Sequence, residues 1–160
     1  QLLDADFVPF VERLLAQAGV EPSRIVLEMT ESYFVTDLEA LRATFDQLRA
    51  IGIRLAMDDF GTGYSSLGLL SQSPADIVKI DRLFIKNIHV ESFNRAFIDA
   101  VIDLCHSVDI EVTVEGVEER TELDTVRAIG ADSVQGFLVS RPLPAGQFEE
   151  RFLGADATGE

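Results

Sequence analysis

The chain of 160 residues is 47% hydrophobic, which is enough for one folded domain with a sizeable core and too little for two ordinary domains. Thirteen basic and 28 acidic residues give a formal net charge of −15, which argues against binding to the backbone of a nucleic-acid polymer. A small phosphate ligand is compatible with this charge if metal ions bridge it to carboxylates.

The sequence shows neither an apolar run of membrane-spanning length nor a signal-peptide layout at its start. We therefore expect a cytoplasmic domain without direct membrane insertion, either alone or as the cytoplasmic part of a larger, membrane-anchored protein. The single cysteine, Cys105, excludes an internal disulfide and a cysteine-based zinc site. Its apolar surroundings predict a buried residue rather than a nucleophile.

The first part of the chain predicts a helix, a strand and a second helix. The first helix covers Asp4–Ala18 and ends at Gly19, and a short strand follows over Arg24–Thr30. The second helix begins at an N-cap, Thr36 or Asp37, and ends at Gly52. Apolar residues at helical spacing in the two helices are Phe7, Phe10, Val11, Leu14 and Leu15, then Leu38, Leu41, Phe45 and Leu48.

Strands and helices continue to alternate along the rest of the chain. The predicted strands are Ile53–Met57, Asp76–Ile80, Ile110–Glu115, Asp132–Gln135 and a final extended piece near Phe137–Ser140. The predicted helices are a short one after the turn-rich stretch DDFGTGYSSL (58–67), a long one over Ser92–Val108 and another over Thr121–Ile129. This alternation implies parallel strands joined by right-handed crossovers, which suits both a doubly wound sheet and a barrel.

The two faces of the predicted strands distinguish these folds. One face is apolar, as expected under a helix layer, and consists of Ile25, Leu27, Met29, Ile53, Leu55, Met57, Val78, Ile80, Val112, Val114 and Val134. The other face is mixed and consists of Val26, Glu28, Arg54, Ala56, Asp58, Ile77, Lys79, Glu111, Thr113, Glu115, Ser133 and Gln135. In strand after strand the mixed face ends in a polar or charged residue at the carboxyl end. Five strands that direct such residues to one place predict the mouth of a TIM-like (β/α)8 barrel.

The strand count predicts only part of such a barrel. About six strands are predicted, whereas a full barrel has eight strands and typically about 250 residues. We therefore expect the first two strands to be absent from this chain. The predicted domain organisation is a partial barrel domain over residues 1–153, roughly from the second helix to the last strand, and a flexible tail over 154–160.

Five clusters carry the residues that suggest chemistry: LEMTES (27–32), MDDFGTGYSSL (57–67), VKID (78–81), VEGVE (114–118) and VQGF (134–137). Each has an ordinary interpretation when taken alone. Glu28 and Glu31 are then solvated or capping acids, Asp58–Asp59 a turn pair, Lys79 a surface lysine, Glu115 and Glu118 a strand-end and a helix-start acid, and Gln135 a strand cap.

Together the clusters indicate a metal site. Carboxylates at equivalent ends of parallel strands repel one another unless their charge is compensated. Oxygen ligands of this kind suit Mg²⁺ or Mn²⁺. Adjacent aspartates can reach two ions, and a pair of ions about 3.5–4 Å apart activates water and stabilises in-line phosphoryl displacement.

The content and order of these clusters resemble the EAL domain family of cyclic di-GMP phosphodiesterases. The resemblance covers essentially the whole chain, from QLLDADF to SRPLP, and DDFGTGYSSL combined with VKID, EGVE and QG is highly specific. It implies a barrel of the EAL type and hydrolysis of cyclic di-GMP to linear pGpG by metal-activated water. It also implies a two-metal Mg²⁺ or Mn²⁺ site, and we expect Ca²⁺ to be inhibitory because it prefers longer bonds and looser coordination.

The resemblance also implies roles for individual residues. Metal binding falls to Glu28, Asp58, Asp59, Glu115 and Gln135, the last through metal-bound water. The predicted catalytic residues are Lys79, Asp58 and Glu115, with Lys79 next to the nucleophilic water. Glu118 is implied to position the site, and Glu31 to anchor the loop after the aspartate pair. That loop comprises Phe60, Gly61, Thr62, Gly63, Tyr64, Ser65, Ser66 and Leu67.

The loop is associated in the family with dimerisation, so we expect a homodimer, with an upstream sensory or GGDEF-type domain in the parent protein. Two family elements are outside this sequence: the Glu-Ala-Leu signature of the first strand and an asparagine ligand of the second. The alternative function is therefore a receptor that binds cyclic di-GMP without cleaving it. A third is a metal-dependent barrel enzyme with another substrate, which the run DDFGTGYSSL disfavours.

Overall fold

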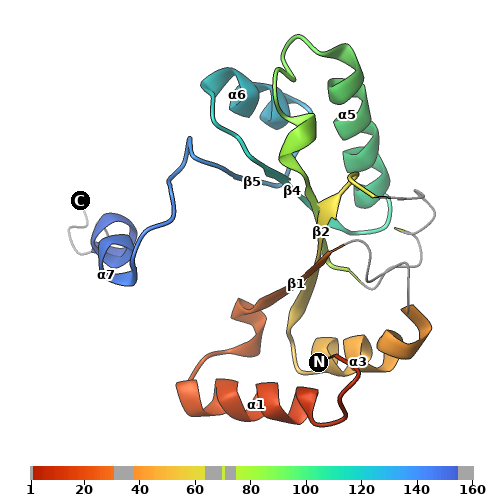
Figure 1. Cartoon of the computed structure of the whole chain (residues 1–160), viewed down its shortest axis with the longest axis vertical. Helices are drawn as coiled ribbons and strands as arrows, with labels where there is room; N and C mark the ends of the chain where they lie inside the picture. The colour runs from red at the N-terminus through yellow and green to blue at the C-terminus, as the bar shows by residue number, and fades with distance from the viewer. Residues whose placement is uncertain (1, 31–37, 64–69, 71–74, 155–160) are drawn as a thin grey trace.

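The computed structural model of the chain describes residues 2–30, 38–63, 70 and 75–154. Helices and strands alternate along these residues, as the sequence predicts (Figure 1). The strands are β1 (Val26–Thr30), β2 (Arg54–Phe60), β3 (Ile77–Ile80), β4 (Glu111–Glu115) and β5 (Ser133–Gln135). The α-helices are α1 (Phe7–Ala18), α3 (Leu38–Ala50), α5 (Ser92–His106), α6 (Arg120–Ala128) and α7 (Ala145–Phe148). Short helical turns are η1 (Pro22–Arg24), η2 (Arg82–Phe84) and η3 (Glu149–Leu153).

The five strands form one parallel sheet in the order β1-β2-β3-β4-β5. Each strand therefore lies beside its neighbours in the sequence. A doubly wound sheet reverses its strand order at a switch point, whereas the wall of a (β/α) barrel does not. The observed order is that of a barrel wall, in agreement with the fold that the two strand faces predict.

The two faces of the sheet differ in burial as the alternation of side chains predicts. The apolar face lies under the helices, and its central residues Leu55, Met57, Val78, Ile80, Val112 and Val114 are all fully buried, whereas Leu27 and Val134 on the outer strands are partly buried. Helices α3 and α5 add Phe45, Leu48, Ile98 and Cys105 to the same core. Burial of Cys105 raises the pKa of its thiol to about 11, with a further contribution from the charge of Asp132. The prediction of a buried cysteine is confirmed.

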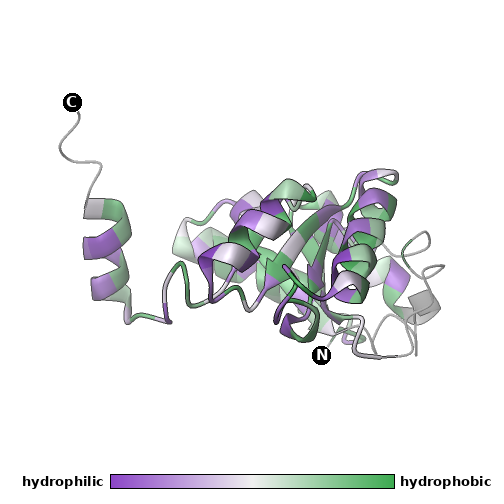
Figure 2. Cartoon of the chain, turned by 90° about the horizontal axis from the view of Figure 1, so that it is seen from above, coloured by the Kyte–Doolittle hydropathy of each residue, from purple (hydrophilic) through white to green (hydrophobic). Residues whose placement is uncertain are grey.

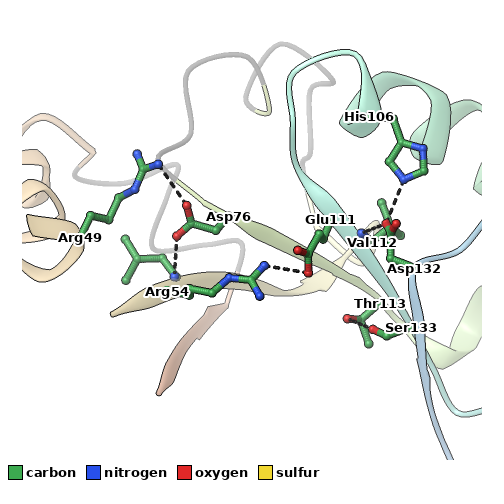
Figure 3. Close-up of polar contacts among 10 residues, drawn as sticks. Arg49, Arg54, Asp76, His106, Glu111, Val112, Thr113, Asp132 and Ser133 are labelled. Atoms are coloured by element: carbon green, nitrogen blue, oxygen red, sulfur yellow. Dashed lines mark hydrogen bonds and ion pairs between the residues drawn. The ribbon is translucent and has the colours of Figure 1, made fainter. Parts of the chain in front are cut away.

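Two aspartates fasten the amino end of the sheet in the same way (Figure 3). Asp76, just before β3, accepts a hydrogen bond from the amide of Leu55 at 2.9 Å and pairs with Arg49 of α3 at 3.0 Å. Asp132, just before β5, accepts a hydrogen bond from the amide of Val112 at 2.7 Å and contacts His106 of α5 at 2.9 Å. Each aspartate thus connects the strand that follows it to a neighbouring strand and to the end of a helix. These contacts fix the register of the strands and therefore the positions of their carboxyl ends.

The mixed face is held at the same end by polar pairs across strands. Arg54 pairs with Glu111 at 2.7 Å, and the hydroxyls of Thr113 and Ser133 are 2.7 Å apart (Figure 3). The first contact joins β2 to β4 across β3, and the second joins the neighbouring strands β4 and β5. The charged residues at the opposite end of this face are described below.

Several predictions need correction. β2 does not end at Met57 but continues through Phe60. Residues 137–139 form a turn rather than an extended strand, with the amide of Val139 bonded to the carbonyl of Gly136 at 3.1 Å. The sheet therefore has five strands among the described residues, not six. The apolar side of α1 is only partly covered, since Phe10 is 52% exposed.

The last helical segment, α7 and η3, is not predicted from the sequence at all. It lies apart from the sheet at the end of an extended connection, and Figure 2 shows hydrophobic and hydrophilic residues on different sides of it. Phe148 and Phe152 pack on each other with ring centroids 5.0 Å apart and are 48% and 37% exposed. The expected short helix after residue 67 and the N-cap at Thr36 or Asp37 are outside the described residues. None of the described helices is long and apolar enough to cross a membrane.

Candidate metal centre

Lys79 is at the centre of the polar cluster that the sequence predicts at the carboxyl end of the sheet. Its Nζ atom is 2.8 Å from Glu28, 3.0 Å from Asp58 and 2.8 Å from Glu115. The four residues come from β1, β2, β3 and β4, and they meet because parallel strands present alternate side chains to the same face. The structure therefore brings together four of the predicted site residues.

The ammonium group of Lys79 is well shielded from solvent, since only 8% of the side chain is exposed. Burial by itself lowers the pKa of a lysine. Here the hydrogen bonds to Glu115, Glu28 and Asp58 outweigh burial, so the pKa of Lys79 lies above its ordinary value. The lysine is held as a cation that balances part of the surrounding negative charge.

A β-bulge explains how two consecutive aspartates reach the same face. Neighbouring residues of a regular strand point to opposite faces, but the pairing of β2 with β3 is irregular between Met57 and Phe60. Within this irregular segment Asp59 has a positive φ of 57°, an uncommon conformation for a residue other than glycine. The bulge is stabilised by Thr62, whose hydroxyl donates to the carbonyl oxygen of Asp59 at 2.9 Å.

Carboxylate oxygens of Asp58, Asp59 and Glu115 all lie within 4.8 Å of one another. The Oδ1 atom of Asp58 is buried and, apart from the ion pair with Lys79, has no hydrogen-bond partner among the described residues. Burial and the nearby charges of Asp58 and Asp81 raise the pKa of Asp59, although Lys79 acts in the opposite direction. A carboxylate cluster with mutual repulsion, in which the buried Asp58 oxygen is compensated by the Lys79 cation, fits a divalent cation with oxygen ligands.

Gln135 lies beside this cluster because β5 pairs with β4 in a register that places it opposite Glu115. Two glycines allow the loops after these strands to approach closely. A Cβ atom at Gly136 would lie 2.0 Å from the carbonyl oxygen of Val117, and one at Gly116 would lie 2.2 Å from Cβ of Arg82. The glycines of EGVE and QGF therefore have a packing role next to the carboxylates.

Glu118 lines a cavity of about 260 Å³ together with Glu115, Gln135 and Asp81. The residue that fixes its backbone, Glu122, was not predicted from the sequence. The Glu122 side chain is buried, and its Oε2 atom accepts hydrogen bonds from the amides of Glu118 and Glu119 at 2.9 and 3.0 Å. An acid three residues after a helix start is a known capping signal, which points to this role of Glu122.

The predicted loop is described only in part. Phe60 is buried, and Gly61 packs so closely on η2 and α5 that a Cβ atom there would lie 2.6 Å from the ring of Phe84. Thr62 makes the contact with Asp59 given above, and Gly63 is exposed. Glu31, Tyr64, Ser65, Ser66 and Leu67 are outside the described residues, so their predicted roles stay predictions.

Comparison with known proteins gives consistent results. The model of the EAL domain family matches residues 1–142. The chain is 39% identical over 147 residues to the bifunctional diguanylate cyclase/cyclic di-GMP phosphodiesterase MucR of Pseudomonas aeruginosa, which covers 92% of this chain and 22% of MucR. The chain thus spans about a fifth of the length of that relative.

Solved structures show the same relationship. The EAL domain of Mycobacterium smegmatis DcpA superposes with a TM-score of 0.89 at 34% identity, over 100% of this chain and 71% of that one. Klebsiella pneumoniae BlrP1, solved as a calcium and cyclic di-GMP complex, gives a TM-score of 0.82 at 35% identity over 87% of this chain and 35% of that one. BlrP1 was also solved as a manganese and cyclic di-GMP complex. The predicted α/β fold of the EAL barrel type is confirmed.

Proposed function

This chain belongs to the EAL domain family, and we propose that the protein carrying it hydrolyses cyclic di-GMP to linear pGpG. The observation that carries the proposal is the convergence of Asp58, Asp59 and Glu115 around the buried cation of Lys79. The names of MucR and of the BlrP1 complexes support cyclic di-GMP as the substrate.

The proposed metal site uses Glu28, Asp58, Asp59 and Glu115 as carboxylate ligands, with Gln135 binding a metal-bound water. Mg²⁺ or Mn²⁺, two ions in the complete site, would lower the pKa of a bound water and neutralise charge on the phosphate. The buried Oδ1 atom of Asp58 and the proximity of the three carboxylates fit these hard cations. The bulge at Asp59 holds both aspartates on the ligand side of the sheet.

In the proposed mechanism Lys79 acts on the attacking water and on the transition state. Its fixed ammonium group orients the attacking water and offsets negative charge that develops on the phosphorus oxygens in the transition state. Its three ion pairs hold the side chain in place before substrate arrives, so little reorganisation is needed. Glu118 is proposed to keep the neighbouring loop in position, and Glu31 to anchor the loop of residues 60–67.

The proposed partners follow from the same family membership. We propose a homodimer in which the loop of residues 60–67 takes part, and an upstream sensory or GGDEF-type domain in the parent protein. The relative MucR is a bifunctional diguanylate cyclase/cyclic di-GMP phosphodiesterase, which supports the second proposal. A net charge of −15 disfavours nucleic-acid polymers as partners.

Metal dependence tests the proposed site. The full-length protein is incubated with cyclic di-GMP after removal of metal by EDTA, and then with Mg²⁺, Mn²⁺ or Ca²⁺. We expect pGpG with Mg²⁺ and Mn²⁺ and suppression by Ca²⁺, because the longer bonds and looser coordination of calcium misplace the attacking water. Turnover in EDTA, or full turnover in Ca²⁺ alone, would contradict the assignment.

A further inference from the structure

A small cavity adjoins the metal centre on the side of β4 and β5. It measures about 260 Å³, and the residues that line it include Asp81, Arg82, Glu115, Glu118, Gln135 and Phe137. Glu115 and Gln135 belong to the proposed metal site, so an occupant of this cavity would lie beside that site. Among the described residues of its lining, Arg82 is the one that is basic.

The position of Arg82 is fixed by backbone packing. It is separated from β3 by Asp81 alone and begins η2, where Asp81 acts as N-cap by accepting a hydrogen bond from the amide of Leu83 at 2.8 Å. The stem of Arg82 lies against Gly116, where a Cβ atom would be 2.2 Å from Cβ and 3.1 Å from Cα of the arginine. Gly116 has a positive φ of 74°, which favours glycine at this position for a second reason. The side chain therefore starts from a defined point on the cavity wall.

Arg82 differs from Lys79 in that its side chain has no ion pair with any residue that the structure describes. Lys79 is engaged by three carboxylates and is nearly inaccessible to solvent. The exposed side chain of Arg82 makes no hydrogen bond or salt bridge within the described part of the chain, although Asp81, Glu115 and Glu118 line the same cavity. The cavity thus presents an uncommitted guanidinium group beside a strongly acidic site.

We propose that Arg82 binds a phosphate oxygen of the cyclic dinucleotide, a role that rests on the function proposed above. The ligand carries two negative charges into a site with an excess of carboxylates, so a cation that is not already paired favours its binding. A guanidinium group forms paired, charge-assisted hydrogen bonds with phosphate, and lysine offers only a single point of charge. Arg82 is therefore a substrate-binding residue and takes no part in the bond-breaking step.

The test compares three variants of the full-length protein with cyclic di-GMP as the probe. Arg82→Ala removes the contact and Arg82→Lys keeps the charge. Arg127→Ala is the control, because it removes the same charge from an exposed residue at the far end of α6. For each, kcat and KM are measured with Mg²⁺, equilibrium binding is measured with Ca²⁺, and the melting temperature is recorded.

We expect Arg82→Ala to raise KM and Kd about tenfold, the lower range for a charged hydrogen bond, because the side chain is exposed. Turnover stays within about threefold of wild type, since the contact is present in both ground and transition states. Arg82→Lys loses less affinity than Arg82→Ala, the control variant matches wild type, and all melting temperatures agree.

Two results overturn the role of Arg82 while leaving the proposed function intact. One is a KM for Arg82→Ala equal to that of the control, with wild type active. The other is an equal loss of affinity in the alanine and lysine variants, which would assign the arginine to a base edge rather than to a phosphate. A wild-type protein that neither binds nor cleaves cyclic di-GMP overturns the proposed function, and this inference with it.

Discussion

Replacing Lys79 by alanine separates its two roles, in stability and in turnover. The substitution removes the cation that contacts Glu28, Asp58 and Glu115 at 2.8–3.0 Å and leaves three carboxylates facing one another. Breaking a buried ion pair costs about 3–5 kcal/mol. The lower value applies here because 48% of the Glu28 side chain is exposed. In a domain of this size about 3 kcal/mol corresponds to a fall in melting temperature of roughly 6–12 °C.

The assay is thermal unfolding of the complete EAL domain in EDTA and again with saturating Mg²⁺. Lys86→Ala, which removes the same charge from an exposed residue, serves as the control. We expect Mg²⁺ to raise the melting temperature of the Lys79 variant more than that of wild type, because the ion takes over part of the lost charge compensation. In the presence of Mg²⁺ we also expect kcat to fall about 100-fold or more while KM changes little.

Two results would refute this reasoning. A Lys79→Ala domain that melts with the Lys86→Ala control would mean that the ion pairs do not contribute to stability. Equal losses in affinity and turnover would make Lys79 a ligand-binding residue.

Four further predictions follow from particular contacts. Asp58→Asn should abolish hydrolysis. It should change the free energy of unfolding by less than about 1 kcal/mol, because it removes one charge from a crowded acidic cluster. A variant that unfolds would show that Asp58 has a structural role. Gly136→Ala should destabilise by about 3 kcal/mol, since its Cβ atom would lie 2.0 Å from a backbone carbonyl oxygen. Gly146→Ala is the control, because an added Cβ atom there has no neighbour within 4 Å, and this variant should be as stable as wild type or more stable. Equal melting temperatures of the two alanine variants would show that the backbone around Gly136 relaxes. Burial raises the pKa of Asp132, but the hydrogen bonds from His106 and the Val112 amide together lower it below its ordinary 3.8, so the contribution of Asp132 to stability is present above that pH and is lost as the pH falls further. Asp132→Asn should therefore be less stable than wild type at pH 7, with a gap that closes towards pH 2, and a constant gap in acid titrations would contradict this. Residues 1–160 expressed alone should associate without turnover, because among the described residues β1 and β5 each pair with one neighbouring strand; light scattering that finds an active monomer would refute this.

The local sequence pattern predicts the fold and the position of the site well. Alternating side chains assign the faces of all five strands, because a strand has only two faces and one of them is apolar. The convergence of Glu28, Asp58, Lys79 and Glu115 follows from that alternation and from the parallel order of strands. These inferences need only the local sequence pattern, and not the contacts between helices and strands that are distant in the sequence.

The features that the sequence pattern does not predict depend on contacts between distant segments. Asp58, Asp59 and Gly61 are turn-forming residues, so a turn was expected where the structure has a bulged strand end. Phe137–Ser140 is apolar enough for a strand, but the contact of Gly136 with the backbone of Val117 leads it into a turn. The segment formed by α7 and η3 is short, and its phenylalanines are partly exposed. Its sequence therefore has no apolar periodicity long enough to predict a helix.

The most direct test of the proposed hydrolysis uses isotopically labelled water. The full-length protein is incubated with cyclic di-GMP and Mg²⁺ in water enriched in oxygen-18, and the product is analysed by mass spectrometry. Water attack on one phosphorus atom breaks its bond to the 3′ oxygen, so we expect pGpG with a single labelled oxygen in the terminal 5′ phosphate. Cyclic di-GMP that binds and is recovered intact and unlabelled would contradict the account, and would assign the protein to the receptors that bind the nucleotide without cleaving it.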